Sequence, residues 1–320
     1  MQRSAYIQHS VLLVGVLLTL VPFYFVISNA ARSNNEIFRS PFGFPQALTN
    51  MLSFTKLSLT GRTSEIAYVV RISEGDEITF ETRRDGYKAA MSAQWKIMTN
   101  GYIYAWEVLR GYMINSLFVS LVSGFGVLLL GSITAYVFAR YRFPGSNILF
   151  YIIISVMMIP GILTLVPSVQ LVTALNLRNS YTVLILPYIA TGQVFAIFVF
   201  RSFFRGLSED LFDAARMDGA GHLHLYRHVI LPLSLPSLSV IAIMNILATW
   251  NGFMWPFIVN SDQQYHVIAS GLYNMSTGPI ADNYSAMFSA YVLSSIPLLL
   301  LFVYATRPFI QGMGTGAFKA

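Results

Sequence analysis

The sequence predicts an all-α membrane protein with six transmembrane helices and a small α+β insertion between the first two helices. Three observations support this prediction. Hydrophobic residues make up 55% of the 320-residue chain and charged residues only 11%, whereas soluble domains carry about a quarter charged residues. Six apolar runs without Asp, Glu, Lys or Arg are each long enough to cross a bilayer, which takes about 20 residues. A long polar segment separates the first two runs.

The composition also excludes several classes of function. The chain has no cysteine, so it has no disulfide framework and no thiol nucleophile. The net charge of +6 lies largely beside the apolar runs, where it indicates membrane topology, and nucleic acid is not an expected partner. No Walker-type phosphate loop is present, so ATP is not hydrolysed by that route here. The apolar runs lack the ionisable groups of proton-driven carriers. The energy for any active process is therefore expected from a partner.

The expected spans are residues 4–31, 112–139, 147–170, 179–200, 233–258 and 285–306. Basic residues cluster after the second, fourth and sixth spans, beginning with Arg140 and Arg142, whereas the opposite short loops carry only Arg178, Asp262 and Asp282. By the positive-inside rule, both termini and the loop before residue 233 are expected in the cytoplasm. Residues 1–31 then form the N-terminus and first span, and residues 307–320 form a cytoplasmic tail.

The outer segment, residues 32–111, is the expected insertion. Residues 65–72 and 77–83 are β-prone runs, and the turn-forming residues between them predict a hairpin. Residues 87–98 show helical spacing. A small α+β cap and a partly ordered segment without a specific role both remain open. The membrane core would then be residues 112–306.

A polar stretch interrupts this core at residues 209–232. Ser208 is suited to cap a helix, and the acidic residues that follow favour its first turns. Ala214 and Ala215 place small side chains on one face, which allows another protein to approach closely. Gly219 permits a sharp turn, and Pro232 suits the first turn of the next helix. The stretch therefore predicts two short helices between membrane spans, with an amphipathic loop on the lipid surface as the alternative.

The spacing of this stretch resembles the cytoplasmic EAA loop of ABC importer permeases, which couples them to their ATPases. Asp213 stands where the family has Glu, and Tyr226 stands where it has Phe. The matching positions, which the resemblance assigns to ATPase coupling within residues 205–232, are Asp213, Ala214, Ala215, Asp218, Gly219, Ala220, Tyr226, Leu231 and Pro232.

Three further stretches resemble the shorter permease subunit of maltose-type carbohydrate ABC importers, the MalG-like group. They are residues 110–120, residues 248–256 with their Trp-Asn and Trp-Pro pairs, and the glycine-rich residues 311–320. The likeness omits roughly residues 56–100. By the same likeness, the tail residues expected near the ATPases are Gln311, Gly312, Gly314 and Gly316.

The resemblance implies a type I ABC importer permease in a bacterial or archaeal plasma membrane. It implies a second permease subunit, two ATPase subunits that bind ATP and Mg²⁺, an extracytoplasmic solute-binding protein, and membrane lipid around the spans. This chain is expected to bind no cofactor and to be no enzyme. The expected cargo is an oligosaccharide or related sugar. A polyol, glycerol phosphate or uronic-acid oligomer is the alternative cargo, and an ATP-independent channel or secondary carrier is the alternative class.

Two sets of residues could contact small ligands. Gln193, Trp250, Asn251 and Trp255 are aromatic or amide groups that could line a sugar path, although interfacial anchoring explains the tryptophans equally well. His222, His224 and His228 cluster in the polar stretch, but no carboxylate joins them at ligand spacing. A solvated histidine face is therefore expected there, with no metal.

Overall fold

The structure is a computed structural model that describes the backbone of residues 2–74, 77–278 and 281–317 and the side chains of residues 9–71, 79–278 and 281–304. It divides into two compact units. The first unit comprises residues 1–110 and 272–296, and the second comprises residues 111–271 and 297–320. The units are described separately.

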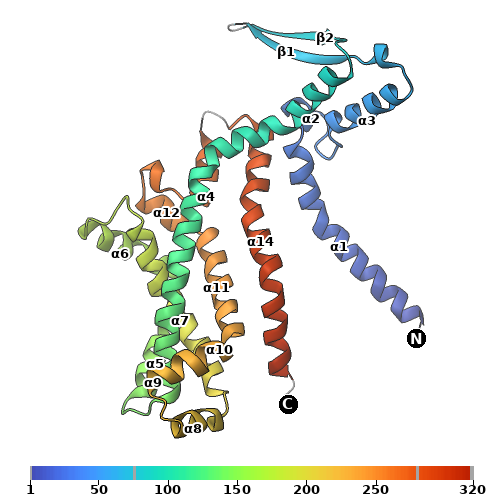
Figure 1. Cartoon of the computed structure of the whole chain (residues 1–320). Helices are drawn as coiled ribbons and strands as arrows, with labels where there is room; N and C mark the ends of the chain where they lie inside the picture. The colour runs from blue at the N-terminus through green and yellow to red at the C-terminus, as the bar shows by residue number, and fades with distance from the viewer. Residues whose placement is uncertain (1, 75–76, 279–280, 318–320) are drawn as a thin grey trace. The chain divides into compact units, whose positions relative to one another are not determined.

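The first unit contains the N-terminal helices and a two-stranded sheet (Figure 1). Its elements are α1 (Gln2–Ala30), α2 (Asn34–Arg39), α3 (Gln46–Leu59), a 3-10 turn (Thr63–Glu65), β1 (Tyr68–Glu74), β2 (Glu77–Arg83), the start of α4 (Tyr87–Arg140), the end of α13 (Ile268–Thr277) and the start of α14 (Tyr284–Ala317).

The hairpin in this unit confirms the predicted one. β1 and β2 pair antiparallel, with Tyr68 opposite Arg83 at one end. Tyr68 packs with Phe54 of α3 and Ala90 of α4 in a small core of its own. The helix expected over residues 87–98 does not stop there, because α4 continues for 54 residues without a proline to end it.

The second unit consists of helices throughout its described residues. Its elements are the rest of α4, α5 (Ser146–Ser155), a 3-10 turn (Val156–Met158), α6 (Gly161–Ala174), α7 (Thr182–Arg205), α8 (Glu209–Met217), α9 (His222–His224), a π-helical turn (Leu225–Ile230), α10 (Leu231–Leu233), α11 (Leu235–Trp250), α12 (Met254–Val259), a 3-10 turn (Gln263–Tyr265), the start of α13 and the end of α14.

Small residues hold α4 close to its neighbours in this unit. A Cβ at Gly131 would lie 2.8 Å from the Cβ of Ala196 on α7. The hydroxyl of Thr249 on α11 donates a hydrogen bond of 2.8 Å to Ser120 on α4. In lipid, the hydrophobic effect does not drive helices together, so membrane helices pack through small and hydroxylated residues of this kind. These contacts bring α7 and α11 against α4.

Within the described residues, four helices are long and apolar enough to cross a membrane, and six spans result if each of two bent pairs counts as one. The first pair bends by 97° between α5 and α6, inside the span expected over residues 147–170. Ile159 takes an extended conformation before Pro160 there, because a proline disfavours helical geometry in the residue before it. The second pair, residues 222–233 and α11, bends by 75°.

The span expected over residues 233–258 is also interrupted. α11 ends at Trp250, and Asn251 and Gly252 precede the separate short helix α12. Pro187, in contrast, lies inside α7 without ending it. The sequence predicted the positions of these apolar runs but not which of them remain single helices.

Candidate functional site

The polar loop after α7 begins as the sequence predicts. The Ser208 hydroxyl accepts a hydrogen bond of 3.3 Å from the backbone N–H of Asp210 at the start of α8. Glu209 and Asp210 lie in the first turn, where the helix dipole favours negative charge. Residues next to one another in the loop therefore determine where α8 begins.

Arg140, at the C-terminal end of α4, fixes the position of α8. Its guanidinium lies 3.7 Å from the centre of the Phe212 ring, and Phe212 is only 1% exposed. Arg140 also donates hydrogen bonds of 2.6 and 3.0 Å to the carbonyls of Phe204 and Leu207. A 2.6 Å ion pair joins it to Glu209. One side chain therefore ties the ends of α4 and α7 to α8.

Sequence reasoning missed this anchor. It counted Arg140 only toward topology and did not assign a role to Phe212. A large aromatic residue among the charged residues of a short helix is a signal of a buried face. The sequence could have indicated Phe212 in this way, but nothing in it pairs Phe212 with an arginine 72 positions earlier.

α8 ends at a left-handed glycine. Gly219 has φ +82°, and its N–H bonds to the carbonyl of Arg216. The N–H of Ala220 reaches back to the carbonyl of Ala215 at 2.9 Å. These two bonds form a Schellman motif, which glycine favours because it has no Cβ to clash. Gly221, by comparison, has φ −75° and needs no glycine.

The second half of the loop is one continuous helical run from His222 to Leu233 with a π-helical turn inside it. Pro232 was predicted to begin the next membrane helix, but it lies in the last turn of this run, and the bend follows at Ser234. The hydroxyl of Tyr226 lies 2.7 Å from that of Ser132 on α4. The Tyr226 hydroxyl, which a Phe would lack, thus adds a bond between the loop and α4.

His222, His224 and His228 are all exposed, as expected, and their rings also contact other side chains. The Tyr136 hydroxyl on α4 is 3.0 Å from Nδ1 of His222, and the Tyr141 ring stacks on His222 with centroids 4.4 Å apart. His224 and His228 stack on each other. In the part of the chain that the structure describes, no group of three or more His, Cys, Asp or Glu side chains could hold a metal ion.

Most exposed side chains of the loop are charged or polar, but three large apolar side chains are exposed among them. Leu211, Met217 and Leu223 are 48%, 88% and 66% exposed. Ala214 is exposed as well, whereas Ala215 and Ala220 pack against the core that contains Phe212 and Leu225. The small residues Ala214 and Ala215 were predicted to share one face, but only Ala214 is on the exposed side. Exposed apolar side chains on such an element are suited to contact another protein.

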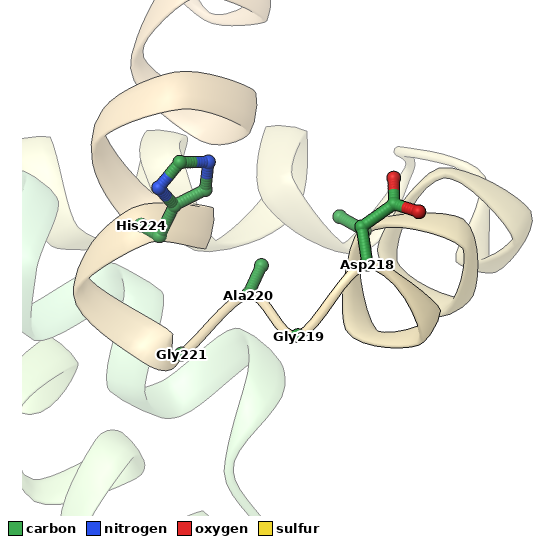
Figure 2. A pocket seen from close by; sticks show the side chains of 6 residues that line it. Asp218, Gly219, Ala220, Gly221 and His224 are labelled. Atoms are coloured by element: carbon green, nitrogen blue, oxygen red, sulfur yellow. The ribbon is translucent and has the colours of Figure 1, made fainter.

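A shallow pocket lies at the turn between α8 and α9. Its volume is about 350 Å³. Figure 2 shows Asp218 and His224 on opposite sides of it, with Ala220 between them. The lining residues are Ala215, Asp218, Gly219, Ala220, Gly221 and His224. Most of this wall is backbone or small side chain, so a projecting side chain of another protein could enter it.

The four residues assigned to a substrate path are dispersed. Trp250 is buried in α11, and the Trp255 indole donates a 2.9 Å hydrogen bond to the carbonyl of Val183. Asn251 is exposed and bonds to its own helix, and Gln193 is half-buried on α7. The tail residues Gln311, Gly312, Gly314 and Gly316 belong to the helical backbone of α14, but their side chains lie outside those described.

Comparison with known proteins identifies the family of the chain. The family model of the inner membrane component of binding-protein-dependent transport systems matches residues 102–314. The chain is similar to the diacetylchitobiose uptake system permease protein NgcG of Streptomyces coelicolor, with 29% identity over 99% of this chain and 90% of that protein. It is 36% identical to the arabinooligosaccharides transport system permease protein AraQ of Halalkalibacterium halodurans, over 64% of this chain and 72% of that protein.

A solved structure shares the fold. It is a chain of a bacterial ABC transporter involved in the import of the acidic polysaccharide alginate, with a TM-score of 0.71, 17% identity and coverage of 96% of both chains. The matched family region contains the whole polar loop together with α7 and α11 on either side of it. The chain therefore belongs to the family of inner membrane components of binding-protein-dependent transport systems, and it is a permease subunit of an ABC importer rather than an enzyme.

Proposed function

We propose that this permease forms the translocation path of an ATP-driven carbohydrate importer together with a second, different permease subunit. The relatives NgcG and AraQ are named for the uptake of diacetylchitobiose and arabinooligosaccharides, and both cargoes are short sugar chains. The proposed cargo is therefore an oligosaccharide. A polyol, glycerol phosphate or uronic-acid oligomer is the alternative within the same kind of machine.

One observation carries the mechanism: Arg140 holds α8 against the ends of α4 and α7, while Leu211, Met217 and Leu223 of the loop stay exposed. Because Arg140 bonds α8 to the ends of α4 and α7, a movement of α8 is transmitted to these two helices. In this mechanism, the coupling loop within residues 205–232 docks through α8 and the turn that follows it on one of two ATPase subunits, which bind the ATP and Mg²⁺. Movement of the ATPases would then shift α4 and α7 and reorient the path.

The proposed roles within the loop follow from these contacts. Ala214 lies on the exposed surface and meets the ATPase, together with Asp213 and Asp218. Gly219 shapes the turn, and Ala215, Ala220, Tyr226, Leu231 and Pro232 hold the loop on the membrane helices. Gln311, Gly312, Gly314 and Gly316 remain candidates for a second ATPase contact, and Gln193, Trp250, Asn251 and Trp255 for the substrate path. The chain itself holds no cofactor in this proposal.

The proposed topology has six spans, with each bent pair counted as one. Both termini, residues 205–232 and the tail 307–320 face the cytoplasm, and residues 32–111 form an extracytoplasmic insertion before the core 112–306. The chain has no native cysteine, so single cysteines can be labelled without background. Leu223→Cys and Leu59→Cys are suitable because both side chains are well exposed.

The topology predicts opposite labelling of these two cysteines. In right-side-out vesicles, a membrane-impermeant maleimide should modify Leu59→Cys before permeabilisation and Leu223→Cys only after it. Labelling of Leu223→Cys from outside would place the loop on the wrong side for an ATPase and would overturn the mechanism.

The transport proposal itself is tested with the reconstituted complex. Its ATPase activity should rise with an oligosaccharide-loaded binding protein and should rise less with binding proteins loaded with glycerol phosphate or a polyol. Uptake should stop when the ATPase subunits are left out. Uptake by proteoliposomes that contain only the permeases would support a channel or secondary carrier instead.

A further inference from the structure

Arg201 is a buried cation on α7, and its role is separate from the coupling loop. Its side chain is confined between α7 and α5, and the residue is only 9% exposed. The guanidinium lies 3.7 Å from the centre of the Phe150 ring. Nη2 donates to Oδ1 of Asn147 at 3.3 Å, and Nε donates to the carbonyl of Phe138 at 3.4 Å. All these partners are neutral.

No carboxylate in the described part of the chain neutralises this charge. The ion pairs among the described residues involve Arg32, Arg62, Arg83, Arg140 and Arg216, and none includes Arg201. Nη1 of Arg201 makes no hydrogen bond there either. A buried charge is costly unless it is paired, and an aromatic ring offsets only part of that cost. Nη1 of the guanidinium is therefore available to bind an anion from outside the chain.

A second cation lies beside it. Arg205 follows one helical turn later on α7, so both side chains lie on the same side of the helix. Arg205 is exposed and makes no hydrogen bond or ion pair with the described residues. Exposed apolar side chains flank the pair, with Phe198 46% exposed on α7 and Tyr151 69% exposed on α5. The two charges thus lie at the edge of an apolar surface.

We propose that Arg201 and Arg205 bind the headgroup phosphate of an anionic phospholipid. Both arginines lie at the C-terminal end of a helix that is long and apolar enough to span a membrane, which is the depth at which headgroups lie. Arginine binds phosphate with charge-assisted hydrogen bonds in a planar, bidentate geometry. The acyl chains would then cover Tyr151 and Phe198. Because free phosphate has no such chains, the flanking apolar surface favours a lipid.

Two variants test the site in the complete transporter. The complex is reconstituted in nanodiscs of phosphatidylcholine, and binding of a labelled phosphatidylglycerol is measured by titration. Arg201→Gln should weaken the binding by about tenfold or more, the usual effect of losing a hydrogen bond to a charged group. Arg205→Gln should weaken lipid binding as well. Because Arg205 is exposed, this loss of binding would not be explained by misfolding of the variant. Arg84→Gln removes an equal charge from an exposed position after β2 and should leave lipid binding unchanged.

Other outcomes would overturn the proposal. Equal binding of phosphatidylglycerol and phosphatidylcholine would show that no anionic headgroup is selected. Full competition by inorganic phosphate at millimolar concentration would identify a phosphate site without a lipid. A structure of the complex with a partner carboxylate on Arg201 would replace the lipid with a protein contact. None of these results depends on which solute the transporter carries.

Discussion

The attachment of α8 to the membrane helices is expected to depend on Arg140 much more than on Glu209, although the two form a 2.6 Å ion pair. The Glu209 side chain is 70% exposed, so solvent screens the pair and limits it to about 1 kcal/mol or less. Arg140 is 4% exposed and also serves two carbonyls and the Phe212 ring. Replacing Arg140 would leave both carbonyls without their donor and the Phe212 ring without its cation, which costs about 3 kcal/mol or more.

Hydrogen–deuterium exchange in the complete transporter measures this difference. Arg140→Gln should accelerate amide exchange across α8 by at least about a hundredfold, because about 1.4 kcal/mol corresponds to a factor of ten. Glu209→Gln should change the same amides by less than about tenfold. In transport assays, the transporter that carries Arg140→Gln should still hydrolyse ATP but take up little solute, because a detached α8 no longer moves α4 and α7.

The opposite pattern would refute this reasoning. If Glu209→Gln opened α8 as much as Arg140→Gln, the ion pair would be the main link. If Arg140→Gln left the exchange of α8 unchanged while uptake fell, Arg140 would act in some way other than by holding that helix.

Two further predictions concern glycines, each with a matched glycine as control. Gly219→Ala should destabilise the loop by about 1–2 kcal/mol, because its φ of +82° strains any residue with a Cβ, whereas Gly221→Ala should be nearly neutral. Thermal unfolding and uptake of the reconstituted transporter measure both, and equal effects would contradict the role of the left-handed turn. Gly131→Ala should lower stability by about 1–3 kcal/mol, because its Cβ would meet α7 at 2.8 Å. Gly111→Ala on the same helix meets nothing within 4 Å and should be neutral or slightly stabilising; a harmless Gly131→Ala would show that α4 and α7 can move apart.

The sequence predicted features that depend on residues close together in the chain better than features that depend on contacts between distant helices. The hairpin of β1 and β2 and the start and end of α8 depend on residues a few positions apart, so capping and turn chemistry predicted them. The EAA-like spacing predicted the family for the same reason. The bend at Pro160 and the unbroken course of α7 through Pro187 show the limit of such rules, because neighbouring helices decide whether a proline interrupts a span.

The sequence alone thus determined the membrane class, the apolar runs, the hairpin and the loop with its cap and its terminal glycine. These features follow from composition and from contacts within one or two helical turns. Only the tertiary structure showed that Arg140 reaches Glu209, 69 residues later in the chain, and packs on Phe212. It alone showed that Arg201 is buried and that no carboxylate among the described side chains pairs with it. Both facts depend on which helices lie side by side, and no local pattern in the chain encodes that pairing.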